Sequence, residues 1–271
     1  MMNKKLFALL LTVLMLCGAA FALADGITVT DMHDREITLD APATRIVALT
    51  PSDCEILCAI GCEDALVGRG KYCDYPESIS ELPVVQSGAE TNIEEILALE
   101  PQVVLMSDMS QTEEQANMLE QNGVKVVISD ANDIAGVYTA IRMIGTLMAK
   151  NDEAEALIAD MQATFDEIAA KSEKSDKTIY FEVTPLQWGL WTAGSDTFMD
   201  ELATMCGVTN AFADISGWQS ISEEQVIERN PDYIVSIAGM GDTAIEEIMG
   251  RDGWGDIGAV KNGRVYNADS N

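Results

Sequence analysis

An uninterrupted helical segment near the middle of the chain, residues 151–174 (NDEAEALIADMQATFDEIAAKSEK), constrains the fold most strongly. Asn151 suits an N-cap position, acidic residues follow it, and lysines stand at the far end, which is the charge order that the helix dipole favours. Four apolar residues recur at helical spacing and predict one apolar stripe: Leu157, Met161, Phe165 and Ile168. Because no Gly or Pro interrupts it, the segment predicts one rigid helix of roughly 33–36 Å, about the width of a small domain.

Two similar stretches flank this helix, TNIEEILALEPQVVLM at 91–106 and ISEEQVIERNPDYIVSI at 221–237. Aligned on Pro101 and Pro231, each shows a cap residue, an acid at the second helical position, an apolar pair, the proline and a β-rich run. The alignment places Glu94 opposite Glu224. An acid in a first helical turn beside a capping box is ordinary helix chemistry. The repeat nevertheless predicts two similar halves, each carrying one such carboxylate.

Short β-rich runs alternate with helical segments on both sides of the central helix. Such alternation predicts mostly parallel sheets that are covered on both faces. The sequence therefore predicts an α/β protein with two Rossmann-like lobes, at 25–150 and 175–271, joined by the long helix at 151–174. The chain stops soon after its last predicted strand, so the C-terminal lobe is expected to lack a closing helix.

The N-terminus, residues 1–24, has the features of an export signal. Two lysines precede an apolar core of about a dozen residues, which is too short for an ordinary membrane span. The A-x-A pattern ending at Ala24 predicts cleavage there and a mature start at Asp25. A lipid-anchored N-terminus at Cys17 is the alternative, although Leu16 stands where such signals usually have a small residue. Either form predicts a protein exported to the periplasm or to the outer face of the cell membrane.

The charge of the chain excludes some functions. With 16 basic and 45 acidic residues the formal net charge is −29, so duplex nucleic acid is not an expected partner. Catalysis has little support, because the chain has no G-x-S-x-G motif and a single histidine, His33, in a predicted turn. The G-x-G-x-x-A pattern at 239–244 lies too late in the chain for a dinucleotide fingerprint. We therefore expect no catalytic residue and no resident cofactor.

Cys54, Cys58 and Cys62 follow one another at four-residue spacing on a predicted helix. This spacing offers two soft ligands to a metal, but the chain has no C-x-x-C motif and no histidine partner there. Five cysteines in so long a mature chain also do not indicate a disulfide scaffold. We interpret the three as small buried apolar residues and expect no metal site.

Aromatic residues gather in loops predicted at the ends of strands and helices, namely Tyr72, Tyr75, Trp188, Trp191 and Trp218. In parallel α/β sheets the loops at the carboxyl ends of strands line the ligand crevice. Aromatic side chains with a polar tip suit a large, flat, partly apolar ligand. Packing of each aromatic onto the core of its own lobe is the alternative for any single residue.

From about residue 27 to residue 271, the chain resembles the binding proteins of ABC importers for vitamin B12, haem and iron-siderophores. The matching pieces are RIVALTP (45–51), CDYP (73–76), NIEEILALEP (92–101), TAG (192–194), ISEEQ (221–225) and KNGRVY (261–266). The resemblance implies two lobes joined by a single rigid helix, a ligand held between the lobes, and no chemistry performed on it. It also implies that Glu94 and Glu224 dock onto arginines of a permease driven by a cytoplasmic ATPase. We expect the protein to be a monomer.

Within this family the chain most resembles the cobalamin binders, which implies ligand contacts at Asp53, Tyr72, Trp191 and Trp218. Gly88 and Ser107, however, stand where the best-known cobalamin binder carries Trp. A large and nearly neutral corrinoid suits a cleft with few cations, because anionic ferric siderophores are usually met by clustered Arg and Lys. A ferric siderophore, and haem or another metal chelate ligated by Tyr72, remain the alternatives. An exported enzyme acting on a metal chelate is the competing function class.

Overall fold

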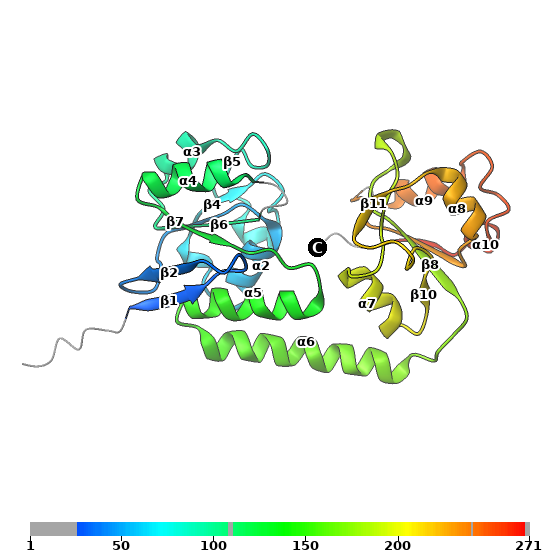
Figure 1. Ribbon diagram of the computed structural model, residues 1–271, viewed down its shortest axis with the longest axis horizontal. Coiled ribbons are helices and arrows are strands. Elements are labelled where there is room, and N and C mark those ends of the chain that lie inside the picture. The colour runs from blue at the N-terminus through cyan, green and yellow to red at the C-terminus, as the bar shows by residue number, and fades with distance from the viewer. Residues whose placement is uncertain (1–25, 108–110, 240, 269–271) are drawn as a thin grey trace, which may run out of the picture.

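The computed structural model describes residues 26–107, 111–239 and 241–268, with the exception of the side chain of Asp242. The expected signal peptide, its cleavage site and Cys17 lie outside these residues. Two lobes stand side by side, and the long helix α6 (Asn151–Lys171) runs beneath both of them in the view of Figure 1. Within the described ranges, no helix has both the length and the apolar character needed to cross a membrane.

The N-terminal lobe is built on a five-stranded parallel sheet in the order β5-β4-β3-β6-β7. The strand of this sheet that comes first along the chain, β3, is central, and the order runs outward from it in both directions. The strands are β3 (Ile46–Ala48), β4 (Leu66–Gly70), β5 (Val84–Val85), β6 (Val103–Met106) and β7 (Lys125–Ile128). An antiparallel hairpin of β1 (Ile27–Thr30) and β2 (Glu36–Leu39) precedes the sheet.

Helices cover both faces of this sheet, as the alternating sequence predicts. The helices are α2 (Pro51–Ala59), α3 (Ile93–Ala98), α4 (Glu113–Gln121) and α5 (Ile134–Leu147), with 3-10 turns at Glu63–Ala65 and Glu77–Ile79. One buried cluster joins α2 and α5 to the sheet, and a second joins α3 and α4 to it. Strand residues contribute alternately to the two clusters, Ile46 to the first and Val47 to the second, because successive side chains point to opposite faces.

The C-terminal lobe repeats this plan with a four-stranded parallel sheet in the order β10-β8-β12-β13. Its strands are β8 (Thr178–Glu182), β10 (Thr209–Asn210), β12 (Tyr233–Ser236) and β13 (Val265–Asn267). Its helices are α7 (Phe198–Met205), α8 (Glu223–Arg229), α9 (Asp242–Met249) and α10 (Gly258–Lys261), with a 3-10 turn at Leu186–Trp188. Tyr180, Phe212 and Trp254 are fully buried and pack together at ring distances of 5.5 and 6.5 Å. The predicted α/β class with two lobes and mostly parallel sheets is therefore confirmed.

The connecting helix differs in detail from the prediction. It ends at Lys171, three residues earlier than expected, and Lys150 rather than Asn151 is its N-cap residue. Asn151 instead accepts a hydrogen bond from the Thr146 hydroxyl (2.9 Å). The fully buried positions are Ala154 and Ile158, whereas the predicted stripe is only partly covered. The reason is that α6 packs on α5 near its start and then spans from one lobe to the other.

Five short elements lie in segments that the sequence predicts as loops or leaves unassigned. These are β5, β10, α10 and a separate antiparallel pair, β9 (Trp191–Ala193) with β11 (Trp218–Ser220). Strands of two or three residues are too short to show a period in the sequence, so only pairing with a distant partner defines them.

Candidate functional site

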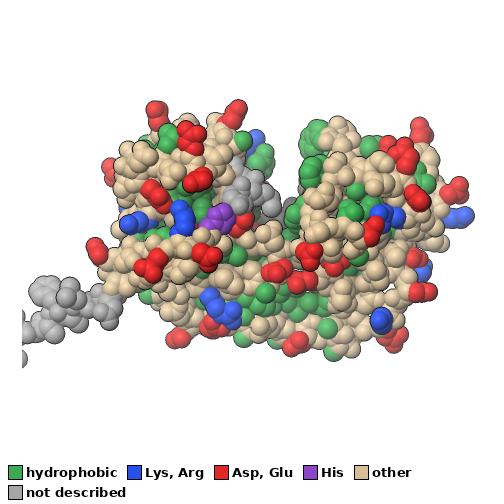
Figure 2. All heavy atoms as spheres, in the orientation of Figure 1, with side chains coloured by type: hydrophobic (Ala, Val, Ile, Leu, Met, Phe, Trp, Pro, Cys, Tyr) green, Lys and Arg blue, Asp and Glu red, His purple; other side chains and the backbone are tan. Residues whose placement is uncertain are grey.

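Both sheets place loops at the carboxyl ends of their strands, and in doubly wound sheets such ends form the ligand crevice. In the N-terminal lobe the strand order reverses between β3 and β6, and in the C-terminal lobe between β8 and β12. A hollow separates the two lobes in the space-filling view (Figure 2), with hydrophobic side chains on both of its walls. This cleft is the candidate ligand site.

Tyr72 lies in the segment that follows β4, at the carboxyl end of that strand. Its side chain is 69% exposed and lies beneath the Lys71 ammonium, 5.3 Å from the ring centroid. The segment is fixed from below by Arg69, a buried residue whose guanidinium donates hydrogen bonds to the carbonyls of Cys73 and Ser80, both at 2.8 Å. Arg69 is therefore engaged with the backbone, and its charge is directed into the lobe.

Asp53 lies beneath the floor of the cleft, in the first turn of α2. It has no exposed surface, and its Oδ2 accepts a 2.5 Å hydrogen bond from the Thr50 hydroxyl. Its Oδ1 has no hydrogen-bond partner among the described residues. Burial raises the pKa of Asp53 to about 6, although the Thr50 and Ser129 hydroxyls lower it in part. The structure thus brings Asp53 under the strand ends but not to the surface, and its expected ligand contact stays a prediction.

The raised pKa makes the stability of the lobe depend on pH. The folded pKa of about 6 lies above the ordinary aspartate pKa of 3.8. The stability linked to this proton is therefore fully present below pH 3.8 and is lost as pH rises through 6. We expect Asp53→Asn, which keeps an oxygen acceptor for Thr50, to raise the free energy of unfolding at pH 7.5 by about 2–3 kcal/mol. Urea denaturation at pH 4 and 7.5 checks this, with exposed Asp74→Asn as control. A variant less stable than wild type at pH 7.5 would contradict it.

In the C-terminal lobe, Trp191 and Trp218 lie on the antiparallel pair β9–β11, in which Trp191 pairs with Ser220 and Trp218 with Ala193. Trp191 is 42% exposed, while Trp218 is half-buried and packs on the ring of Phe198 at 5.5 Å. Trp188, in the 3-10 turn just before β9, is the most exposed of these aromatics at 73%. The tryptophans are therefore brought together on one small sheet, although Trp191 and Trp218 are 27 positions apart in the sequence.

Two hydrogen bonds cross between the lobes at the base of the cleft. The Phe198 amide donates to the Asn132 carbonyl (3.1 Å), and Glu201 Oε2 accepts from the Ile134 amide (2.8 Å). Ile134 is the first residue of α5, so the Glu201 carboxylate satisfies one of the amides that a helix start leaves without a partner. Since Phe198 also supports Trp218, the C-terminal aromatic wall is coupled directly to this contact between the lobes.

Glu94 and Glu224 occupy matching positions in the two lobes, each in the exposed first turn of its helix, α3 or α8. In Figure 1, α3 lies on the side of its lobe opposite α6, and α8 lies in the upper part of the other lobe. Hydrogen bonding to Ser222 and to the backbone lowers the pKa of Glu224. The predicted symmetry of the caps is incomplete, however.

Of these two helices, α8 alone has the complete capping box, formed by Ser222 and Gln225. In α3 the side chain of Asn92 accepts from the amides of Glu94 and Glu95, as expected of an N-cap. The Asn92 amide itself donates to the Gln86 carbonyl, and Glu95 accepts from the Gln86 amide (3.0 Å) instead. The neighbouring β5 segment, which sequence periodicity does not reveal, competes for the reciprocal bond.

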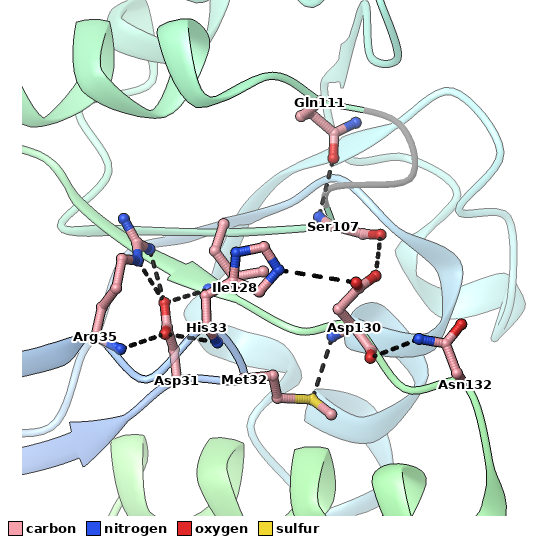
Figure 3. Close-up of polar contacts among 9 residues, drawn as sticks. All are labelled: Asp31, Met32, His33, Arg35, Ser107, Gln111, Ile128, Asp130 and Asn132. Atoms are coloured by element: carbon pink, nitrogen blue, oxygen red, sulfur yellow. Dashed lines mark hydrogen bonds and ion pairs between the residues drawn. The ribbon is translucent and has the colours of Figure 1, made fainter.

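The single histidine belongs to a polar cluster that the sequence does not predict (Figure 3). His33 Nε2 lies 3.9 Å from Asp130, whose other carboxylate oxygen accepts from the Ser107 hydroxyl at 2.9 Å. Asp31, buried beside it, accepts hydrogen bonds from Arg35 and from the Ile128 amide (3.1 Å). Burial raises the pKa of Asp31, but these hydrogen bonds outweigh it and hold the pKa below its usual range. The cluster fastens the β1–β2 hairpin to the end of β7.

The three cysteines in and just after α2 are mostly enclosed by the apolar core of the N-terminal lobe. Cys54 and Cys62 are buried and Cys58 is partly buried, and burial raises the pKa of both Cys58 and Cys62. Cys62 lies beyond the end of α2, after Gly61, rather than on the helix as predicted. Over the described part of the chain, no three His, Cys, Asp or Glu side chains are grouped as metal ligands would be.

Comparison with known proteins gives matches over most of the chain. The sequence model of a family described as periplasmic binding protein matches residues 46–271. The uncharacterised ABC transporter substrate-binding lipoprotein YvrC of Bacillus subtilis is 33% identical over 250 residues, covering 90% of this chain and 78% of that protein. A vitamin B12-binding protein of Vibrio campbellii is 28% identical over 276 residues, covering 100% of this chain and 90% of its own length.

A solved structure is also similar in sequence as well as in fold. It is a Staphylococcus epidermidis protein described as a possible iron-binding (periplasmic solute-binding) protein. It is 30% identical, with a TM-score of 0.69, and the match covers 84% of this chain and 90% of that one.

Proposed function

The chain belongs to the periplasmic binding protein family, and from this premise we propose that it is the extracytoplasmic solute-binding component of an ABC importer for a corrinoid. The protein captures the ligand between its lobes outside the membrane and delivers it to a permease powered by an ATPase. Its relatives include a substrate-binding lipoprotein and vitamin B12-binding proteins, which supports both the transport role and an exported location. It performs no reaction on the ligand.

The proposal of a corrinoid rather than an anionic ligand depends on the burial of Arg69 and on its hydrogen bonds to the backbone. Near the Tyr72 segment, the described cations are Arg69 and Lys71. Arg69 is buried and donates to two backbone carbonyls, which leaves Lys71 alone to face a ligand. Ferric siderophores that carry negative charge need several cations, whereas a corrinoid is large and nearly neutral. The walls therefore offer aromatic surface rather than positive charge.

Each proposed contact residue has a distinct part in this site. In this proposal Tyr72 contacts a flat ligand from the N-terminal lobe, and Trp191 and Trp218 contact it from the C-terminal lobe. The exposure of Tyr72 and Trp191 and the pairing of β9 with β11 support this arrangement. Asp53 is proposed as a further ligand contact, and in this conformation it is buried and hydrogen-bonded to Thr50. The cleft that holds the ligand is thus assembled from both lobes.

A ferric siderophore or haem, carried by an importer of the same class, is the alternative ligand. The Staphylococcus epidermidis structure, whose description names iron, favours this alternative. The exposed Tyr72 phenol supplies an oxygen ligand suited to iron in either chelate, and Lys71 supplies one positive charge beside it. A corrinoid-binding protein should therefore bind the nearly neutral cyanocobalamin, whereas a siderophore- or haem-binding protein should bind the anionic iron chelates.

Titration of tryptophan fluorescence tests the proposal. The purified protein is titrated with cyanocobalamin, a ferric hydroxamate, a ferric catecholate and haem, with correction for ligand absorbance. We expect saturable quenching by cyanocobalamin, and about 10- to 100-fold weaker binding by Tyr72→Ala or Trp218→Ala, measured by calorimetry. Phe165→Ala on α6 removes a similar ring away from both walls and is expected to bind normally.

Quenching by a ferric siderophore or haem alone would retain the importer component and reject the corrinoid. Mass spectrometry of the recovered ligand distinguishes a binding protein from the competing function, an exported enzyme. A chemically altered ligand would indicate an enzyme. A folded protein that binds none of the four compounds would contradict the proposed function.

A further inference from the structure

Two cysteines from different parts of the N-terminal lobe meet beneath the Tyr72 segment. Cys54 lies in the first turn of α2, and Cys73 directly follows Tyr72. Both side chains have no exposed surface, and each Sγ lies 3.9 Å from the same oxygen, the Ala48 carbonyl. Each thiol also shifts the pKa of the other, raising that of Cys54 and lowering that of Cys73. They are therefore adjacent, with a shared acceptor at the end of β3.

The other described cysteines have no such partner. Cys58 lies close to Glu55 and Glu63, and its thiol is only partly buried. The Cys62 thiol donates to the Ile60 carbonyl at 3.9 Å. Cys206 is exposed and lies in the other lobe, at the C-cap of α7. The geometry thus selects one pair.

We propose that Cys54 and Cys73 are joined by a disulfide in the exported protein and that this bond fixes the Tyr72 segment to the start of α2. The oxidant is a disulfide of a thiol–disulfide oxidoreductase or of a small thiol such as glutathione, as expected outside the reducing cytoplasm. Two S–H bonds break and one S–S bond forms, while the oxidant takes up two electrons and two protons and leaves as two thiols. The reaction is balanced with no other reactant.

Because both sulfur atoms are completely buried in the folded lobe, the disulfide must form before folding is complete. A bulky oxidant cannot reach either sulfur in the folded lobe, so the exchange takes place while the chain folds after export. Once the lobe has closed, the same burial protects the disulfide from external reductants. The bond closes a loop that contains β4, the rest of α2 and Tyr72. In the dithiol form, hydrogen bonds from Arg69 hold this segment to the lobe.

Oxidative refolding tests the pair directly. The reduced, denatured protein is refolded in a mixture of oxidised and reduced glutathione, alkylated, digested and analysed by mass spectrometry. We expect one linked peptide pair, Cys54 with Cys73, whose mass is lower than that of the two free peptides by two hydrogens. Cys58→Ala is the matched control and should keep this link, whereas Cys73→Ala should lose it. Free thiols at both positions of the folded wild type, or a link to another cysteine, would overturn the proposal.

A second measurement reports on the Tyr72 segment and needs no variant that risks misfolding. Trypsin cleaves after Lys71, which is exposed. The oxidised wild type should be cut there at least several-fold more slowly than the reduced wild type, and equal rates would overturn the constraint on the segment. An effect of the disulfide on ligand affinity rests on the proposed function. A protein that forms the bond yet binds none of the four compounds would reject that function and leave the disulfide intact.

Discussion

Replacing Glu94 and Glu224 together by lysine is expected to reduce ligand uptake to background while ligand affinity stays at the wild-type value. Both carboxylates are exposed in first helical turns, one on each lobe. If they dock onto basic residues of the permease, each substitution turns an attraction into a repulsion. Buried, hydrogen-bonded charge pairs at interfaces cost about 2–5 kcal/mol each when broken, so the double change predicts at least about 1,000-fold weaker docking.

The measurement pairs cellular uptake of labelled ligand with calorimetric affinity and with stimulation of the reconstituted transporter ATPase. Glu114→Lys with Asp152→Lys is the matched control, because these residues are also exposed acids in first turns and the change in net charge is equal. The control should transport normally. Loss of ligand affinity in a folded Glu94/Glu224 variant would contradict the docking role. Ligand uptake by this variant equal to that of the control variant would contradict it as well.

Removing the charge of Arg251 is expected to destabilise the C-terminal lobe by about 3–5 kcal/mol. Its guanidinium donates to both oxygens of Glu182 at 2.7 and 2.8 Å, and both side chains are only 2% exposed. It also bonds Glu247 on α9 and lies 4.4 Å from the Trp254 ring centroid. Arg251→Met leaves the Glu182 carboxylate buried without its partner, at the end of β8.

Thermal and urea denaturation measure this effect. Arg142→Met is the control, because Arg142 makes a similar two-bond contact with Glu155 at the surface, where an ion pair contributes little. Arg251→Met combined with Glu182→Gln should recover part of the loss, since no buried charge then remains. A smaller loss for Arg251→Met than for Arg142→Met would contradict the interpretation.

The stability lost in Arg251→Met should also depend on pH, because it depends on the protonation of Glu182. Burial raises the pKa of Glu182 by more than Arg251 lowers it, so the native state binds this proton more tightly than the unfolded state does. Stability linked to this proton is present at low pH and is lost as pH rises through the folded pKa. Without Arg251 the pKa rises further. The deficit of Arg251→Met should therefore shrink as the solution is acidified.

The sequence by itself determined the class of the fold and the exposed acids. Alternating apolar periods and a long segment without Gly or Pro are local signals, and they located both parallel sheets and α6 to within a few residues. The first-turn positions of Glu94 and Glu224 are equally local, because a cap residue and the turn after it define them. Matching motifs along the chain were enough to identify the family, which the comparisons confirm.

The tertiary structure decided which residues of the site meet and which charges are available. Asp53 lies fully buried below the cleft, Arg69 is turned inward, and Cys54 meets Cys73. Arg251 pairs with Glu182, 69 positions away. These pairings, like the β9–β11 sheet that gathers the tryptophans, depend on how strands and helices pack. A one-dimensional period reports which face of an element is apolar, but burial and partner choice arise only when distant segments come together.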